Sequence, residues 1–403
     1  MSSLTIVADE NMPRVVELFS ALGRVRTVAG RTMSAADVAD ADVLLVRSVT
    51  PVNSALLAGS PVRWVGTATI GVDHLDTEWL RTQGIGYANA PGCNAVSVVE
   101  YVLSVLAVLD GVLEPLLARQ ARVGIVGLGN VGGRLLQRLQ TMGIEAVGYD
   151  PLLAGTADMP AAVRPALVPL AEVLGCEVIC LHTPLTRTGR WPTHHLIGER
   201  ELGQLQPGSV LLNAGRGPVI DNQALLRTLE RRSSALRVVL DVWEQEPAIA
   251  PLLLDRVAIG TPHIAGYSLD GKLRGTEMLL AACCTALGLP LSSPQSPATG
   301  VSAVELPDPG ATGVQLIRDA LLAVYDVRED DARLRAAVAG ARGDRQQIGA
   351  AFDRLRKEYP VRRELSAVPL RQWQSLSDAQ RGTLLALGFR EAGQVSPSSD
   401  SSA

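Results

Sequence analysis

The chain has 403 residues, too many for one ordinary hydrophobic core, so two or three domains are expected. Hydrophobic residues make up 47% and aromatic residues 3%, and Lys+Arg 37 against Asp+Glu 41 give a formal net charge of -4. So few aromatic side chains argue against a stacking platform for single-stranded nucleic acid, and the balanced charge argues against a binder of nucleic acids or anionic membranes.

The N-terminal residues run straight into a strand pattern, without a basic region and an apolar stretch behind it, so no signal peptide is expected. Every apolar run is broken well before it reaches the length of a membrane span. The five cysteines are an odd, scattered set that fits reduced thiols, and we expect Cys176 and Cys180 to be ordinary buried thiols. The sequence therefore predicts a cytoplasmic globular protein.

Short runs of Val, Ile and Leu alternate with helical patterns, which predicts an α/β fold with parallel sheets. The first series of strands is expected at residues 4–8, 43–46, 63–65 and 85–87. Its helices are expected at residues 13–23, 53–58 and 77–83. A long helix follows at residues 95–109. Because the strands are continuously apolar rather than alternating, both faces of the sheet should be covered.

A second α/β series follows a short linker. Its strands are expected at residues 123–126, 146–149, 177–181, 210–213, 238–240 and 257–259, and a helix at 270–287 ends at Gly288. Residues 290–310 are rich in Pro, Ser and Gly and read as a linker. Residues 311–389 form a small third unit, and the polar residues 396–403 are expected to be disordered.

A glycine fingerprint, G-x-G-x-x-G, stands at Gly127, Gly129 and Gly132, directly after a Val/Ile strand and before a helical pattern. The three glycines permit a tight turn, close approach of backbone N–H groups to a pyrophosphate, and close helix–strand packing. Asp150 ends the next strand, where a carboxylate accepts hydrogen bonds from a ribose and disfavours a 2′-phosphate. The pattern predicts NAD rather than NADP; the alternative is a glycine-rich connection that binds nothing.

The fingerprint begins after more than a hundred residues of earlier α/β structure. We therefore expect the nucleotide domain to be inserted into another domain, to which the helix after Tyr267 returns. A cleft between two such domains is a favoured place for a small-molecule site.

Three polar clusters follow predicted strand ends of the second series, and they carry Arg216, then Asp241 with Glu246, then His263. An arginine holds a carboxylate bidentately, and a histidine is the usual base for a hydroxyl proton near neutral pH. A carboxylate beside that histidine orients it and favours its charged form. Taken singly, each residue has a simpler interpretation: Arg216 as part of a surface ion pair, Glu246 as a charge at the start of a helix, and His263 as a hydrogen-bonding loop residue. Together they predict hydride transfer between a 2-hydroxy acid and a nicotinamide.

The sequence resembles the D-isomer-specific 2-hydroxy-acid dehydrogenase family over residues 1–290, and a subgroup of that family over nearly the whole chain. The resemblance is carried by the strings Val7-Ala-Asp-Glu-Asn-Met-Pro13, Leu45-Val-Arg-Ser-Val-Thr50, Val65-Gly-Thr-Ala-Thr-Ile-Gly-Val-Asp-His74, Ala90-Pro-Gly-Cys-Asn-Ala95, Val99-Glu-Tyr101, Gly260-Thr-Pro-His-Ile-Ala-Gly-Tyr267 and Val324-Tyr-Asp-Val-Arg-Glu-Asp-Asp331. It implies NAD-dependent oxidation of a phosphorylated four-carbon sugar acid.

The resemblance also implies a domain plan of two Rossmann-like domains and a small α+β C-terminal dimerisation domain. A flavodoxin-like substrate domain would comprise residues 1–95 and 267–290, and an inserted NAD-binding domain residues 96–266. The dimerisation domain would comprise residues 291–395, leaving 396–403 as a disordered tail. The expected partners are a second copy of the chain and a small phosphorylated hydroxy acid, with neither nucleic acid nor membrane.

Roles for individual residues follow from the same resemblance. His263 is implied as proton donor and acceptor, with Glu246 and Arg216 as its catalytic companions. Residues implied at the NAD are Gly127, Gly129, Asn130, Val131, Gly132, Asp150, Thr183, Ala214, Gly215, Asp241 and Gly266. Residues implied at the substrate are Ser48, Thr69 and Tyr267, of which Ser48 and Thr69 alternatively read as simple turn residues. Gly215 departs from the family, where a cysteine stands.

A phosphorylated substrate needs further positive charge, and Arg47, next to Ser48, is the first candidate for it. Lys272, Arg274 or Arg342 are alternatives. A rival interpretation is a sibling enzyme such as a D-3-phosphoglycerate dehydrogenase, and a more distant one is an NAD-sensing protein without catalysis.

The remaining histidines are expected to do no chemistry, except that His182 lines the adenosine pocket or is an ordinary structural histidine. His194 and His195 lie in a polar loop, and His74 follows Asp73 in a turn. No cluster in the sequence shows metal-ligand spacing, so no metal is expected.

Overall fold

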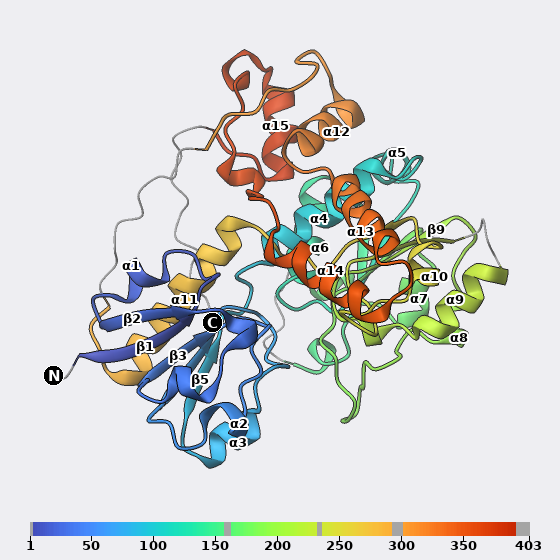
Figure 1. Cartoon of the computed structure of the whole chain (residues 1–403). Coiled ribbons are helices and arrows are strands. Elements are labelled where there is room, and N and C mark those ends of the chain that lie inside the picture. The colour runs from blue at the N-terminus through green and yellow to red at the C-terminus, as the bar shows by residue number, and fades with distance from the viewer. Residues whose placement is uncertain (1–2, 157–162, 232–235, 292–300, 392–403) are drawn as a thin grey trace. The chain divides into compact units, whose positions relative to one another are not determined.

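The structure is a computed structural model that describes residues 3–156, 163–231, 236–291 and 301–391. The chain divides into two compact units (Figure 1). One comprises residues 1–96 and 267–300, and the other comprises residues 97–266 and 301–403.

The first unit is built on a five-stranded parallel sheet of order β2-β1-β3-β4-β5. Its strands are β1 Leu4–Asp9, β2 Gly23–Val28, β3 Val43–Val46, β4 Trp64–Thr67 and β5 Gly86–Asn89. Its helices are α1 Val15–Phe19, α2 Ser54–Leu57, α3 Thr77–Thr82 and α11 Leu269–Leu287, with short 3₁₀ turns at Gly30–Thr32 and Ala35–Val38.

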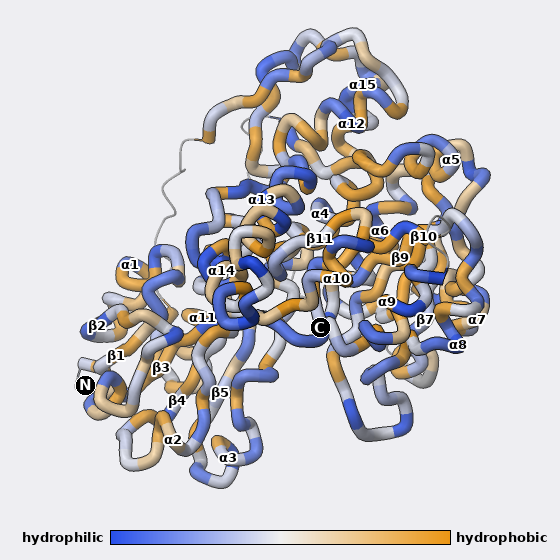
Figure 2. Tube along the Cα trace, turned by 45° about the vertical axis from the view of Figure 1, so that its right-hand side comes forward, coloured by the Kyte–Doolittle hydropathy of each residue, from blue (hydrophilic) through white to orange (hydrophobic). Residues whose placement is uncertain are grey.

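Strand β3 shows why this sheet is covered on both faces. Val43 and Leu45 pack into one buried cluster with residues of α1 and α11, while Leu44 and Val46 pack into another with residues of α2 and α3. All four side chains are fully buried, as expected of a central parallel strand. Hydrophobic colour gathers at the central strand β3 (Figure 2).

Helix α11 is defined by its two ends. The Ser268 side chain accepts a hydrogen bond of 2.8 Å from the Gly271 N–H, and Gly288 ends the helix in the left-handed conformation at φ 64°. The stop predicted at Gly288 is therefore confirmed.

The second unit contains a six-stranded parallel sheet of order β11-β10-β9-β8-β6-β7. Its strands are β6 Val123–Val126, β7 Ala146–Tyr149, β8 Val178–Leu181, β9 Ser209–Asn213, β10 Leu236–Leu240 and β11 Ile259–Gly260. Its helices up to the sheet's end are α4 Ala95–Val108, which starts at the junction of the units, α5 Leu113–Leu117, α6 Gly132–Thr141, α7 Leu170–Leu174, α8 Glu199–Leu202, α9 Asn222–Arg231 and α10 Pro251–Leu254. Short 3₁₀ turns lie at Leu153–Gly155, Arg164–Ala166 and Gly217–Val219.

Chain order reverses in this sheet beside β6, which has β7 on one side and β8 on the other. Such a switch point opens a crevice at the carboxyl ends of the strands, where ligands bind in open α/β sheets. The turn after β6 and the residues after β8 meet at this place.

The described C-terminal residues add helices α12 Gly313–Val324, α13 Val327–Gly340, α14 Arg345–Lys357 and α15 Asp378–Leu387, with 3₁₀ turns at Leu365–Ala367 and Trp373–Ser375. Their one described β pairing is the isolated bridge between Val304 and Leu370. Helix α13 covers the edge of the sheet, because Asp331 accepts the Gly260 N–H at 2.7 Å and Arg335 donates to the Leu254 and Val257 carbonyls. A separate dimerisation domain stays a proposal.

Most predicted elements are confirmed, and the strands at 43–46, 123–126 and 146–149 have the predicted bounds. The helix predicted at residues 13–23 is wrong in its second half: α1 ends at Phe19, and β2 begins at Gly23. Residues 23–28 are exposed at three positions and half-buried at the other three, as fits a strand at the edge of the sheet. The predicted tail at 396–403 and part of the predicted linker lie outside the described residues.

Candidate active site

The glycine turn after β6 is shaped by close packing. Gly127 has a φ of 87°, and a Cβ there would lie 2.9 Å from Thr183 Cγ2. A Cβ on Gly132 would lie 1.9 Å from the Gly127 carbonyl oxygen, so α6 approaches the strand end as closely as only glycine allows. Gly129 differs, because a Cβ there would meet no protein atom within 4 Å.

The N-terminus of α6 is suited to an anion. Its N-cap, Val131, supplies no side-chain cap, and no acidic residue stands in the first turn. Gly129 and Asn130 are exposed in front of it. Free backbone N–H groups and the helix dipole attract a phosphate at such a place.

Asp150 anchors the turn from the end of β7. One carboxylate oxygen accepts the Leu128 N–H at 2.9 Å, and the other accepts the N–H groups of Leu152 and Leu153, each at 3.1 Å. The half-buried carboxylate therefore lies directly beside the glycine turn, at the position that the fingerprint assigns to ribose recognition.

Half-buried His182 and buried Thr183 follow β8, and the Thr183 side chain lies against Gly127. The Thr183 hydroxyl and both ring nitrogens of His182 have no hydrogen-bond partner among the described residues. Burial lowers the pKa of His182 to about 4, so its ring is neutral at physiological pH. Unsatisfied buried polar groups are costly unless a ligand completes them, so Thr183 and the open turn at Gly129 fit a dinucleotide.

His263 and Glu246 form a hydrogen-bonded pair. His263 Nδ1 lies 2.7 Å from one Glu246 carboxylate oxygen, and the other oxygen accepts the Trp243 N–H at 2.7 Å. The histidine side chain is one third exposed, and its backbone is in the left-handed region at φ 56°. Non-glycine residues in that region occur preferentially at functional sites.

The electrostatics of Glu246 favour its ionised form. Burial acts to raise the pKa of Glu246, but the charge and hydrogen bond of His263 and the Trp243 N–H outweigh it, so the pKa lies below its ordinary value. The pair therefore offers an ionised carboxylate at Nδ1 and leaves Nε2 of the same ring for another group.

Asp241 holds the loop that carries His263. Its fully buried carboxylate accepts hydrogen bonds from the Thr261 hydroxyl at 2.7 Å and from the Ile264 and Ala265 N–H groups at 2.8 and 3.0 Å. The Asp241 carbonyl also accepts the His263 N–H at 2.8 Å. These four hydrogen bonds, all to Asp241, explain how the loop keeps the left-handed His263.

Thr261 and Tyr101 support the same loop and were not singled out in the sequence. Thr261 bonds to the Tyr101 hydroxyl at 2.9 Å, and its carbonyl accepts the Trp243 indole N–H at 3.0 Å. Their spacing along the chain carries no signal, because they meet only in the folded unit.

Arg216 lies in a turn at the end of β9, the strand beside β10. The Asn213 side chain accepts the Gly215 N–H and donates to the Arg216 carbonyl. A Cβ on Gly217 would lie 2.0 Å from the Trp243 carbonyl carbon, so the arginine turn and the segment leading to Glu246 touch backbone to backbone. The structure thus brings the Arg216 turn and the His263–Glu246 pair to the same edge of the sheet.

Gly215, in the arginine turn, is buried close to the end of β8. A Cβ there would lie 3.0 Å from the Thr183 carbonyl oxygen and 3.2 Å from that of Leu181. Ala214 is half-buried beside it, and Gly266 follows the His263 loop.

The predicted substrate residues all lie in the first unit. Ser48 is exposed after β3, and the Thr69 hydroxyl after β4 contacts Thr67 Oγ1 and the Gly71 carbonyl, each at 2.8 Å. His74 Nε2 bonds to Thr67 at 2.8 Å, as expected of a structural histidine.

Two cations face the ring of Tyr267. Arg47 lies 5.4 Å and Lys272 4.7 Å from its centroid, and neither forms an ion pair with a carboxylate among the described residues. Burial, with the charge of Arg47 second, lowers the pKa of Lys272 to about 8. Two uncompensated cations in one place are suited to a dianion.

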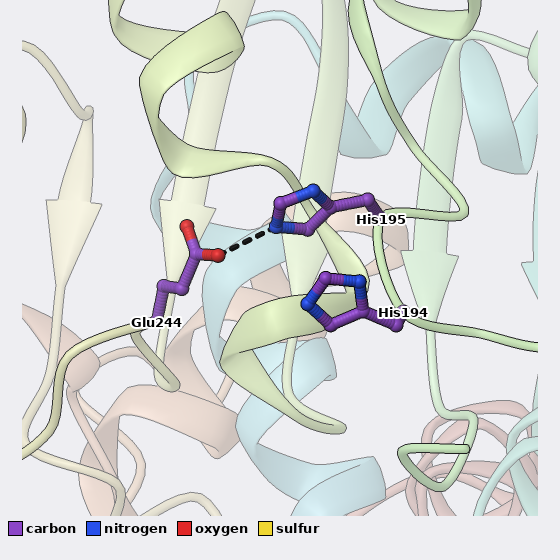
Figure 3. A group of neighbouring side chains, drawn as sticks. All are labelled: His194, His195 and Glu244. Atoms are coloured by element: carbon purple, nitrogen blue, oxygen red, sulfur yellow. Dashed lines mark hydrogen bonds and ion pairs between the residues drawn. The ribbon is translucent and has the colours of Figure 1, made fainter. Parts of the chain in front are cut away.

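The fold brings together three side chains that the sequence analysis did not group, whereas the sequence led us to expect no metal. One candidate ligand atom from each of His194, His195 and Glu244 lies within 4.8 Å of the others (Figure 3). The sequence separates Glu244 from the histidines by 49 residues, so only the fold brings the carboxylate to them. The five cysteines are buried, and no disulfide joins any two of them.

Comparisons with known proteins agree with the class that this geometry defines, a nucleotide-dependent dehydrogenase of hydroxy acids. Residues 112–265 match the D-isomer specific 2-hydroxyacid dehydrogenase, NAD binding domain, and residues 299–388 match a domain of unknown function (DUF3410). Among solved structures, D-lactate dehydrogenase from Aquifex aeolicus, complexed with NAD and lactic acid, aligns with a TM-score of 0.57 at 22% identity, over 70% of this chain and 96% of that chain. At that identity the likeness shows the fold.

Closer relatives specify the family. Erythronate-4-phosphate dehydrogenase of Cellvibrio japonicus is 50% identical over 396 residues, which cover 96% of this chain and 100% of that protein. The enzyme of the same name from Marinobacter nauticus is 49% identical over 96% of this chain and 99% of that protein. The chain belongs to the erythronate-4-phosphate dehydrogenase family of D-2-hydroxyacid dehydrogenases. Among its described residues, no helix is long and apolar enough to cross a membrane.

Proposed function

We propose that this protein catalyses the NAD-dependent oxidation of 4-phospho-D-erythronate to (R)-3-hydroxy-2-oxo-4-phosphooxybutanoate, a step of pyridoxal 5′-phosphate biosynthesis. The observation that carries the proposal is the His263–Glu246 pair at 2.7 Å, on the same sheet edge as the arginine turn and the glycine fingerprint. The near-complete match to relatives of that name supplies the substrate.

The cofactor assignment rests on how well the residues present fit NAD. Gly127, Gly129, Asn130, Val131 and Gly132 would cradle the pyrophosphate at the start of α6. Asp150 would accept hydrogen bonds from the ribose hydroxyls, and Thr183 would supply its hydroxyl, which has no partner within the described part of the chain. When bound, NAD accepts the hydride from C2 of the substrate. Ala214, Gly215, Asp241 and Gly266 are assigned to the walls of the same site.

His263 acts on the proton of the C2 hydroxyl. With Nδ1 turned to Glu246, the neutral ring carries its hydrogen on Nδ1 and offers the Nε2 lone pair as the base. The ionised Glu246 then stabilises the imidazolium that results. Arg216 is assigned to the substrate carboxylate, which a guanidinium binds through two parallel hydrogen bonds.

Ser48, Thr69, Tyr267 and Arg47 are assigned to the rest of the substrate. Arg47 is suited to the phosphate, because it is a cation beside the exposed Ser48 hydroxyl and has Lys272 on the same tyrosine ring. The substrate domain is accordingly assigned to residues 1–95 and 267–290, and the NAD-binding domain to residues 96–266.

We also propose that the protein works as a homodimer in the cytoplasm and that residues 291–395 form the dimer contact. An apolar groove of about 480 Å³ between α5, α12 and α15, lined by Leu117, Val314 and Ile317 among others, supports a contact there. The absence of a disulfide among the five buried cysteines supports a reducing compartment.

The phosphate assignment is tested by a pair of substrates. Arg47→Ala should raise KM for 4-phospho-D-erythronate by about 10–100-fold, the effect of one charged hydrogen bond, and raise KM for D-erythronate much less. Arg81→Ala, on the exposed part of α3 in the same unit, is the matched control and should change neither. Equal losses for the two substrates would refute the role of Arg47.

A further inference from the structure

The cluster of His194, His195 and Glu244 has a local construction that the proposed reaction does not use (Figure 3). His195 Nε2 lies 2.5 Å from a Glu244 carboxylate oxygen. The two imidazole rings stack, with centroids 4.0 Å apart and planes at 18°, and each turns a nitrogen to the side of Glu244. Because the lone pair of each nitrogen lies in its ring plane, one ring must turn out of the stack for both to bind one ion. Two imidazoles and one carboxylate on one side form a ligand set typical of transition metals.

Backbone contacts hold the three side chains in place. His195 is in the left-handed region at φ 53°, and its N–H donates to the Pro218 carbonyl at 2.8 Å. Glu244 exchanges two hydrogen bonds with Asn222, whose N–H donates to the second carboxylate oxygen at 3.1 Å. Three separate segments therefore converge on the cluster without long flexible connections.

The far side of His195 faces a second carboxylate, at a distance too long for a hydrogen bond. While Nε2 faces Glu244, Nδ1 lies 3.9 Å from the Asp221 carboxylate. A carboxylate that accepts a hydrogen bond from the far nitrogen of a ligating imidazole fixes its tautomer and makes the metal-binding nitrogen more basic, and Asp221 would take this role if it moved within hydrogen-bond distance. The side chains of His195 and Glu244 are 35% and 23% exposed, so an ion can enter from solvent.

We propose that His194, His195 and Glu244 form a Zn²⁺ site of the His₂Glu type, with the remaining coordination position taken by water. Bonds of about 2.0–2.1 Å in a tetrahedral site put ligand atoms about 3.3 Å apart, so the His195–Glu244 separation opens by about 0.8 Å. Hard cations such as Mg²⁺, which prefer oxygen ligands, are not expected to compete.

The proposed Zn²⁺ site would link several loops near the catalytic pair. It joins the loop of residues 186–198 to the segments that follow Arg216 and precede Glu246, yet none of its three ligands belongs to the catalytic pair. Bound Zn²⁺ stabilises the folded state, because it binds the assembled loops and not the unfolded chain.

Zn²⁺ binding to the full-length, chelator-treated protein tests the site. Titration against a competing chromophoric chelator should give one Zn²⁺ per chain, and saturating Zn²⁺ should raise Tm. His194→Ala and Glu244→Gln should each lower the affinity at least about tenfold while leaving metal-free turnover unchanged. Glu199→Gln, which removes an exposed carboxylate of the same unit, is the matched control and should bind as the wild type does.

Two further measurements separate this site from other candidate ligands. His263→Asn should retain the ion, because that histidine belongs to the proposed catalytic pair. X-ray absorption at the zinc edge should show only nitrogen and oxygen at about 2.0–2.2 Å, and sulfur at about 2.3 Å would instead mark a cysteine. The proposal is overturned if the wild type binds no Zn²⁺, if His194→Ala and Glu244→Gln bind it unchanged, or if His263→Asn alone abolishes binding.

Discussion

At the scale of single residues, His263 shows how far the backbone is constrained to serve one side chain. Its φ of 56° is unfavourable for most residues, and Asp241 offsets the cost through hydrogen bonds on either side of it. The same geometry points Nδ1 at Glu246 and leaves Nε2 available.

Replacing His263 by asparagine should therefore remove the base while keeping the backbone, because asparagine tolerates the left-handed region. We expect kcat to fall roughly 10²–10⁴-fold, with NADH affinity and the far-ultraviolet circular dichroism spectrum little changed. His194→Ala is the histidine control and should turn over normally without added metal. Full turnover by His263→Asn would refute the assignment of the base.

Two glycines of the fingerprint should affect different properties when mutated, Gly129 cofactor binding and Gly132 stability. A methyl group on Gly129 meets no protein atom, so Gly129→Ala should weaken NADH binding about tenfold or more with little change in Tm. Gly132→Ala should instead lower Tm, because its Cβ would clash with the Gly127 carbonyl. Gly340→Ala, on α13, is the control: its Cβ would meet no atom within 4 Å, so both NADH affinity and Tm should stay unchanged. A Gly129→Ala protein that binds NADH normally would contradict the pyrophosphate site.

At the scale of elements, a buried charge cluster ties the start of α4 to the C-terminal region. Glu100 accepts the Leu365 N–H at 2.8 Å, the Ser97 hydroxyl donates to Glu364, and Arg362 lies 3.9 Å from the Tyr325 ring centroid. Burial first, and then the charge of Glu364, raises the pKa of Glu100 to about 8. The carboxyl group is therefore largely protonated at neutral pH.

This shift predicts a direction for stability against pH. A carboxyl group whose pKa is higher in the folded than in the unfolded state contributes its full stability below the unfolded value, near 4.5, and loses it as the pH rises through about 8. Glu100→Gln should remove that loss. The free energy of unfolding of the variant, relative to that of the wild type, should therefore increase as the pH rises from 5 to 8. Each pKa unit is equivalent to about 1.4 kcal/mol. Parallel pH profiles from urea denaturation of the two proteins would contradict the shift.

Elements with strong local patterns were predictable, and those fixed by tertiary contact were not. The bounds of β3 and β6 were predicted correctly, because a short, continuously apolar run between turn residues is typical of a buried strand. Strand β2 was missed because an edge strand carries fewer apolar residues than a central strand, so its sequence pattern is weaker. Its pairing with β1 depends on Gly23, where a Cβ would lie 2.1 Å from the Leu4 carbonyl oxygen.

At the scale of the whole molecule, the sequence allowed prediction of two α/β sheets and of the chemical groups at one sheet edge. Gly127, Asp150 and His263 were predictable because each stands beside a strand end in a motif with a mechanism. The residues that hold the His263 loop in place were not predictable, because Tyr101 and Thr261 are 160 positions apart in the chain and meet only in the folded protein. The histidine–glutamate cluster was missed for the same reason, since Glu244 becomes a neighbour of His195 only when the strands are ordered in the sheet.

The measurement that tests the central claim most directly is NADH formation by the purified protein. 4-Phospho-D-erythronate, D-3-phosphoglycerate and D-lactate are offered in parallel, with and without a 2-oxo acid, and the oxidised product is followed together with absorbance. The second readout detects turnover that retained cofactor would hide. We expect kcat/KM to be highest by far for 4-phospho-D-erythronate. Preference for another acid would contradict the substrate, and NADH binding without turnover of any of the three would contradict catalysis.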